Sequence, residues 1–215
     1  DGLYHIYNRG VEKRTIFKDT QDYKVFLKYL KESLSPPPDP NKYLKIFTFK
    51  GQTFKGIPRQ PKNFSKEIDL LAYCLMPNHF HLLIKQTENK SVKNFMQSLI
   101  SRYSVYFNKR HSRVGSLFQG RYKAVLITEE SYLLHLSRYI HLNPLEYTKN
   151  LIGAYSSYAE YLEQRKTSWI KPGIVISFFE KKTLPFLQKI NSYKSFVEKY
   201  KGNSDDTLAN LTLED

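Results

Sequence analysis

Two histidines separated by one residue, His79 and His81, are the pair in this chain best placed to do chemistry. They interrupt an apolar stretch, and in a β-strand the side chains at i and i+2 project from one face, with Cα atoms about 6.5–7 Å apart. Two imidazoles on one face can bind one divalent metal while Phe80 turns toward the core. Alternatively, one histidine is a hydrogen-bonded core residue and the other lies at a strand edge. The spacing alone leaves both interpretations open.

A tyrosine and an asparagine four residues apart, Tyr139 and Asn143, share one face of a helix. A phenol, with a pKa of about 10, is a weak nucleophile at neutral pH, and a divalent cation helps by withdrawing charge from a phosphate under attack. Two neutral imidazoles, an amide oxygen and water suit Mg²⁺ or Mn²⁺. Attack of a tyrosine on a phosphodiester gives a 5′-phosphotyrosine and a free 3′-OH, so the strand can be rejoined without ATP. On spacing alone, the competing tyrosines are Tyr103, Tyr106 and Tyr132.

The charge of the chain indicates a polyanionic partner. The 215 residues include 34 Lys and Arg against 20 Asp and Glu, a formal net charge of +14. Residues 90–128 hold eight basic side chains, no acidic ones and interleaved aromatics, the combination that suits single-stranded nucleic acid. The alternative is a solvated basic face whose aromatics belong to the core. We predict contacts with nucleic acid for Arg9, Arg102, Arg110, Arg121 and Lys123.

The elements that must position these residues can be traced from the hydrophobic pattern. Alternating and helical spacings predict the order strand, helix, strand, strand, helix, strand, helix. That order is typical of an α+β fold in which an antiparallel sheet packs against helices. Asp19 or Thr20 can cap the first helix, and residues 128–130 can cap the last, which Pro144 ends. The elements cover residues 3–7, 20–34, 68–76, 79–86, 91–109 and 122–127, and the last helix runs from residue 129 through Ile140.

The chain divides into a main domain over residues 1–150 and a helical C-terminal extension over residues 151–201. Residues 35–66 form a basic, proline-rich insertion, whose segment 41–66 is either a hairpin or a mobile loop. Residues 202–215 form an acidic tail that we expect to be poorly ordered.

Cys74 is the one cysteine, and no apolar run approaches the roughly 20 residues that span a bilayer, so we expect a cytoplasmic protein without membrane association.

Four segments occur in an order and spacing typical of one family. They are YHIYNRG at residues 4–10, LMPNHFHLL at 75–83, LFQGRYK at 117–123 and RYIHLNP at 138–144. Together they resemble the REP-associated tyrosine transposases, relatives of the single-strand insertion-sequence transposases in the HUH endonuclease superfamily. The resemblance covers about residues 3–160.

The resemblance implies a ferredoxin-like antiparallel sheet with helices on its faces. It implies that His79, His81 and Asn143 bind Mg²⁺ or Mn²⁺. It also selects Tyr139 as the nucleophile, because the family's tyrosine precedes an Asn-Pro by four residues. The implied function is cleavage and rejoining of single-stranded DNA beside REP-like hairpins, by a nucleoid-associated monomer or homodimer.

Two other functions remain as alternatives. A replication-initiator or relaxase-type nickase could use the same core, although the Asn-Pro after Tyr139 argues against it. A catalytically silent or host-adopted protein could bind DNA or RNA hairpins without cutting them. Hairpin binding without cleavage under any divalent metal would favour that last alternative.

Overall fold

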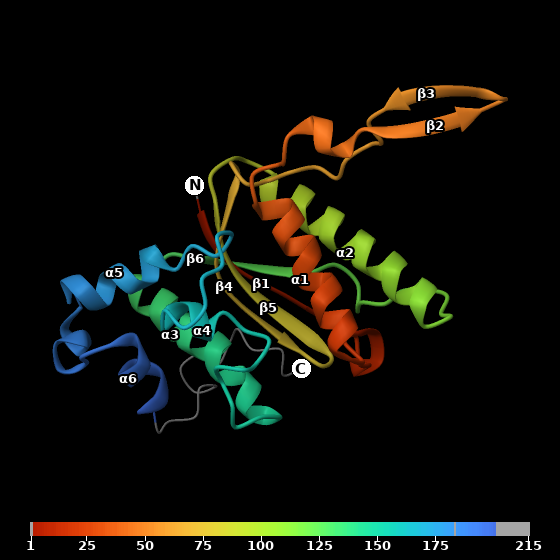
Figure 1. Ribbon diagram of the computed structural model, residues 1–215. Helices are drawn as coiled ribbons and strands as arrows, with labels where there is room; N and C mark the ends of the chain where they lie inside the picture. Colours follow the sequence, from red (N-terminus) through yellow and green to blue (C-terminus); the bar gives the residue numbers. More distant parts are fainter. Residues whose placement is uncertain (1, 183, 201–215) are drawn as a thin grey trace.

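The central element of the computed structural model, which describes residues 2–182 and 184–200, is a four-stranded antiparallel sheet (Figure 1). Its spatial order is β4-β5-β1-β6, and every neighbouring pair is antiparallel. The strands are β1 (Gly2–Arg9), β4 (Ile68–Met76), β5 (His79–Gln86) and β6 (Lys123–Ile127).

Helices cover both faces of the sheet. The first crossover, from β1 to β4, contains α1 (Thr20–Leu34), and the second, from β5 to β6, contains α2 (Ser91–Arg110). This order with these two crossovers is the ferredoxin-like topology, so the predicted fold class is confirmed. On the other face lies α3 (Glu130–Leu142), which makes three layers, whereas the element order alone suggested two.

Strand alternation divides the interior into two cores. On β5, Phe80, Leu82 and Ile84 pack with α1 and α2, whereas Leu83 faces the core around α3. A register shift between Leu70 and Ala72 in β4 brings consecutive apolar residues to that second core. The second core is completed by α4 (Tyr158–Tyr161), α5 (Gly173–Lys181) and α6 (Tyr193–Glu198). The predicted C-terminal extension therefore shares its apolar packing with α3 and the sheet.

Helix ends follow local sequence chemistry only in part. Of the two predicted caps, Asp19 caps α1, because its carboxylate accepts hydrogen bonds from the backbone amides of Gln21 and Asp22. The cap predicted for α3 at residues 128–130 is wrong in its chemistry: Glu129 is the N-cap residue, but its side chain makes no capping hydrogen bond. Short 3₁₀ helices complete the described elements, over Val11–Lys13, Pro40–Tyr43, Asn143–Glu146 and Pro185–Lys189.

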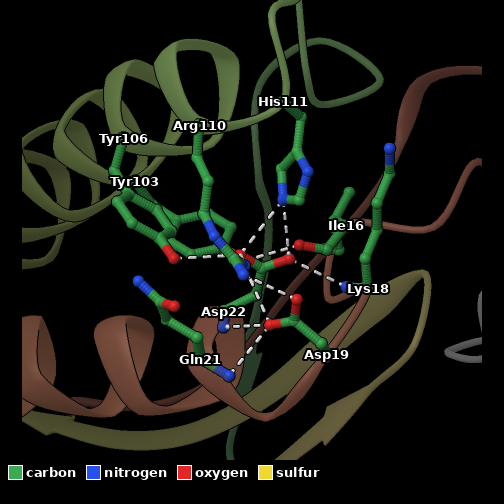
Figure 2. Close-up of polar contacts among 9 residues, drawn as sticks. All are labelled: Ile16, Lys18, Asp19, Gln21, Asp22, Tyr103, Tyr106, Arg110 and His111. Atoms are coloured by element: carbon green, nitrogen blue, oxygen red, sulfur yellow. Dashed lines mark hydrogen bonds and ion pairs between the residues drawn. The ribbon is translucent and has the colours of Figure 1, made fainter.

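A buried carboxylate joins α1 to α2 (Figure 2). Asp22 is fully buried and accepts a hydrogen bond from the backbone amide of Lys18 at 2.9 Å. Three side chains of the second crossover also meet it: the Tyr106 hydroxyl at 3.0 Å, the Arg110 guanidinium at 2.6 Å, and Nε2 of His111 at 3.0 Å. The paired charge and hydrogen bonds offset the cost of burying this carboxylate.

The insertion between α1 and β4 carries a two-stranded hairpin, so of the two forms considered for residues 41–66 the structure contains the hairpin. It consists of β2 (Lys45–Phe49) and β3 (Gln52–Gly56), and it projects away from the sheet (Figure 1). Within the described part of the chain, no helix is long and apolar enough to cross a membrane. The acidic tail predicted for residues 202–215 lies outside the described residues.

Candidate metal and nucleophile site

The two histidines of the HFH segment lie together where β5 begins. Their rings are nearly perpendicular, with centroids 5.0 Å apart, on the face of the sheet that α3 covers. In the register of the sheet, His79 lies opposite Arg9 of β1, and His81 lies opposite Tyr7. The predicted placement of both imidazoles on one face thus holds, with Phe80 buried on the other.

The C-terminal end of α3 brings Tyr139 and Asn143 to the same place. The Tyr139 ring lies edge-on to the His81 ring, with centroids 5.4 Å apart, and is 8% exposed. Asn143 is the C-cap of α3, and its side-chain Nδ2 donates to the Tyr139 carbonyl at 3.1 Å. The four residues that the sequence suggested for a metal and a nucleophile are therefore neighbours in space.

Two side-chain amides fix the hydrogen-bonding state of His79. The Nδ2 of Asn78 donates to the Lys13 carbonyl at 3.3 Å, so Oδ1 of Asn78 is the atom 2.6 Å from Nδ1 of His79. In the same way, the amide of Asn143 turns Oδ1 toward Nε2 of His79, at 3.4 Å. A neutral imidazole has one N–H, and the shorter contact places it on Nδ1. A lone pair on Nε2 then faces a carbonyl oxygen, an arrangement that a cation between them would satisfy.

A third histidine orients His81. Nε2 of His5, on β1, lies 2.9 Å from Nδ1 of His81, and both rings are fully buried. Nε2 of His81 is also buried and has no hydrogen-bond partner within the described residues. When His81 donates its Nδ1–H to His5, the lone pair on Nε2 is left available as a metal ligand.

Burial keeps these imidazoles neutral at pH 7. It lowers the pKa of His5 to about 3. For His79, burial lowers the pKa to about 4, and the contact with Asn143 raises it while the nearby Arg9 charge lowers it. The pKa of His81 is held well below its usual value by burial, with the two neighbouring histidines lowering it further. Neutral imidazoles are the form that binds metals.

The donor set fits a hard divalent cation completed by water. Within residues 2–182 and 184–200, no group of three or more His, Cys, Asp or Glu side chains is arranged to hold a metal ion. A metal here would therefore need the amide oxygen of Asn143 in addition to His79 and His81. The lone pairs described above, one of them on a buried nitrogen with no partner among the described residues, fit that set.

The five predicted nucleic-acid contacts occupy different environments. Arg9 donates to Gln119 at 2.7 Å beside the histidines. Arg102 bonds to Glu32, and Arg110 bonds to the carboxylates at the start of α1 (Figure 2). Arg121 and Lys123 are exposed, with the Lys123 ammonium 5.9 Å from the Tyr7 ring centre. Arg102 and Arg110 therefore join α2 to α1, whereas the side chains of Arg121 and Lys123 are exposed to solvent and accessible to a ligand.

Two residues of the site were not assigned to it from sequence. His5 had no second ligand at a convincing spacing, and its contact with His81 arises only when β1 pairs with β5. His5 belongs to the YHIYNRG segment, and this was the feature of the sequence that could have identified it as a site residue. The second is Asn78, the residue before His79, whose side chain contacts the His79 ring. His141 lies outside the site, where its ring is buried and contacts the hydroxyls of Tyr193 and Ser157.

One family model matches the part of the chain that contains most of the site residues. Residues 52–143 match the family model described as "Transposase IS200 like", a stretch that includes both strand histidines and ends at Asn143. No curated protein matches the chain. The structure of a REP-associated tyrosine transposase bound to a REP hairpin is similar at 12% identity and a TM-score of 0.43, covering 79% of this chain and 91% of that one.

A putative transposase from Deinococcus radiodurans R1 is similar at 14% identity and a TM-score of 0.38, covering 64% of this chain and 87% of that one. At these identities and TM-scores the two similarities carry no argument, and the fold follows from the strand order alone. Over residues 52–143 the chain therefore matches the IS200-like transposases, which confirms the resemblance predicted from its motifs.

Proposed function

We propose that this protein is a single-strand DNA transposase that cleaves and rejoins DNA beside hairpins through a covalent bond to Tyr139. The observation that carries the proposal is the meeting of Tyr139 with two neutral histidines and the Asn143 amide at one end of the sheet. The match to IS200-like transposases supports DNA as the substrate. The net charge of +14 suits a phosphate backbone.

Mg²⁺ or Mn²⁺ is the proposed cofactor, held by His79, His81 and Asn143. When bound, such a cation neutralises charge on the phosphate and assists the leaving oxygen. The protein orients the ligands: Asn78 and His5 hold the N–H groups of the two histidines, so that the lone pairs are directed into the site.

The proposed reaction has two steps at one phosphorus atom. The Tyr139 oxygen attacks phosphorus, its bond to phosphorus forms as the bond to the 3′ oxygen breaks, and the phenolic proton passes through water to give a free 3′-OH. The 5′ phosphate remains attached to Tyr139. In the second step, a 3′-OH from another end attacks the same phosphorus and releases the tyrosine, so no ATP is required.

Trapping the covalent product tests the proposal. The full-length protein is incubated with a pool of single-stranded hairpins from the host genome, and adducts that survive denaturation are sequenced. We expect adducts with Mg²⁺ or Mn²⁺, none with EDTA, and recovered strands cut beside a hairpin. Hairpin binding without an adduct under any divalent metal would overturn the enzymatic proposal.

That outcome would favour the second candidate, a hairpin-binding protein that no longer cleaves. The observation on its side is the burial of the Tyr139 ring, which restricts the approach of a phosphate. Under either candidate we propose a cytoplasmic protein acting at the nucleoid, as a monomer or a homodimer.

Replacing His5 with phenylalanine is expected to weaken Mn²⁺ binding about 10- to 100-fold, because His81 loses the acceptor that fixes its tautomer. Electron paramagnetic resonance of free Mn²⁺ measures the affinity without any DNA. His135→Phe is the matched control, since the His135 ring packs beside Phe186 and Phe196 of the C-terminal extension. A folded His5→Phe protein with unchanged Mn²⁺ affinity would contradict the role assigned to His5.

A further inference from the structure

The hairpin inserted between α1 and β4 belongs to a strongly basic segment. We call residues 41–66 the arm. They contain seven basic side chains and no Asp or Glu. The basic residues of the arm are Lys42, Lys45, Lys50, Lys55, Arg59, Lys62 and Lys66.

The base of the arm is fixed to the end of α1. Phe64 is buried, and its backbone amide donates to the Ser33 carbonyl at 2.7 Å. Asn63 donates to the Ser35 carbonyl at 2.7 Å. At the tip, Lys50 and Gly51 both have positive φ, 49° and 79°, which is the backbone of a two-residue hairpin turn. The base of the arm is therefore held against the end of α1, and its two strands are joined by a regular turn.

Aromatic side chains gather on one face of this ribbon and are open to solvent. Phe47 and Phe54 are directly paired across the strands and stack, with ring centroids 5.6 Å apart. Phe49 lies on the same face and is 65% exposed, and Phe54 is 52% exposed. A two-stranded hairpin is only marginally stable by itself, so exposed phenylalanines on it indicate a binding surface rather than a core.

The positive charge of the arm indicates which kind of partner its phenylalanine face binds. A second copy of this chain would bring seven positive charges of its own arm against the first, whereas nucleic acid supplies phosphates for the basic groups and bases for the rings. Fully stacked base pairs hide their faces, but the unpaired bases of a hairpin loop expose them. We therefore propose that the arm binds the loop of the DNA hairpin, with the phenylalanines stacking on its unpaired bases. This inference rests on the proposed function.

The position of the arm sets the length of hairpin that it can reach. α1 begins near the histidine site, where the amides of Ile16 and Phe17 donate to the Pro77 carbonyl, and it ends at the base of the arm. Its 15 residues span about 22 Å. At 3.4 Å per base pair, a stem must have at least about six base pairs to connect the two places.

Exposed lysines lie along α1 between the histidine site and the arm. Lys24, Lys28 and Lys31 lie on one side of α1 at spacings of four and three residues, from its first turns to its last. Their charges suit the phosphates of a stem that runs alongside this helix. This row of lysines connects the basic arm to the start of α1.

The test compares binding of matched hairpins in EDTA, where no cleavage competes. One probe has a stem of about eight base pairs and a loop of unpaired thymidines, the second has the same stem with an abasic loop, and the third has a stem of about four base pairs. We expect Phe49→Ala/Phe54→Ala to weaken binding of the thymidine loop at least about fivefold, and to change binding of the other two probes less than about twofold. Phe186→Ala is the control, since Phe186 lies outside the arm.

Three results would overturn the proposal: equal losses with thymidine and abasic loops, no loss at all, or a changed oligomeric state of the arm variant in sedimentation. The last would make the arm a contact between copies. Adduct formation separates this inference from the proposed function. If the wild-type protein forms adducts but the arm variant binds every probe normally, the arm proposal fails alone. If loop-dependent binding occurs without adducts, the proposed cleavage fails alone.

Discussion

Tyr139→Phe is expected to abolish the covalent protein–DNA adduct, with the rate falling at least about 10³-fold. The substitution removes one oxygen, the atom that would attack phosphorus, and leaves the ring that packs against His81. The folded state and hairpin binding should therefore persist. Denaturing gel electrophoresis of a strand labelled at its 3′ end, the end that stays with Tyr139, measures the adduct, and fluorescence anisotropy measures the binding.

The same change seven residues earlier on α3 provides a matched control. The Tyr132 hydroxyl is buried and has no hydrogen-bond partner within the described residues, so Tyr132→Phe removes an oxygen without breaking a contact. Adduct formation should be unchanged in that variant. If Tyr139→Phe still forms the adduct, or if Tyr132→Phe abolishes it, the nucleophile is wrongly assigned.

Local rules predicted most of the elements because the boundaries lie in the sequence itself. The β4 and β5 strands begin and end where predicted, on either side of Pro77 and Asn78. Spacing of two on a strand placed His79 beside His81, and spacing of four on a helix placed Tyr139 beside Asn143. Each of these relations joins residues close in the chain, so no knowledge of tertiary packing was needed.

Relations between distant segments could not be predicted in this way. The contact of His5 with His81 depends on which strands pair and in which register. The basic stretch 90–128 has no acidic residue of its own. Arg102 nevertheless forms an ion pair with Glu32 of α1, and Arg110 forms ion pairs with Asp22 of α1 and with its cap, Asp19. An absence of counter-charge along the sequence therefore does not mean an absence of counter-charge in space.

The second large effect is expected from one of those carboxylates. Asp22→Asn should destabilise the protein by about 3–5 kcal/mol, because the Arg110 guanidinium and the donors around Asp22 lose their charged acceptor in a buried place. For a chain of this size, 1 kcal/mol corresponds to about 2–4 °C, so the melting temperature should fall by about 6 °C or more. Thermal and urea unfolding followed by circular dichroism measure both quantities.

Asp19→Asn is the matched control, since it makes the same chemical change three residues earlier on a partly exposed side chain. Asn remains a good helix cap, so α1 keeps its N-terminal hydrogen bonds, and the surface ion pair of Asp19 with Arg110 contributes little in water. The control should therefore melt close to the wild-type protein. Equal losses in the two variants would mean that the exposed Asp19–Arg110 ion pair contributes as much as the buried carboxylate of Asp22. A normal melting temperature for Asp22→Asn would mean that the amide satisfies the same donors without the charge.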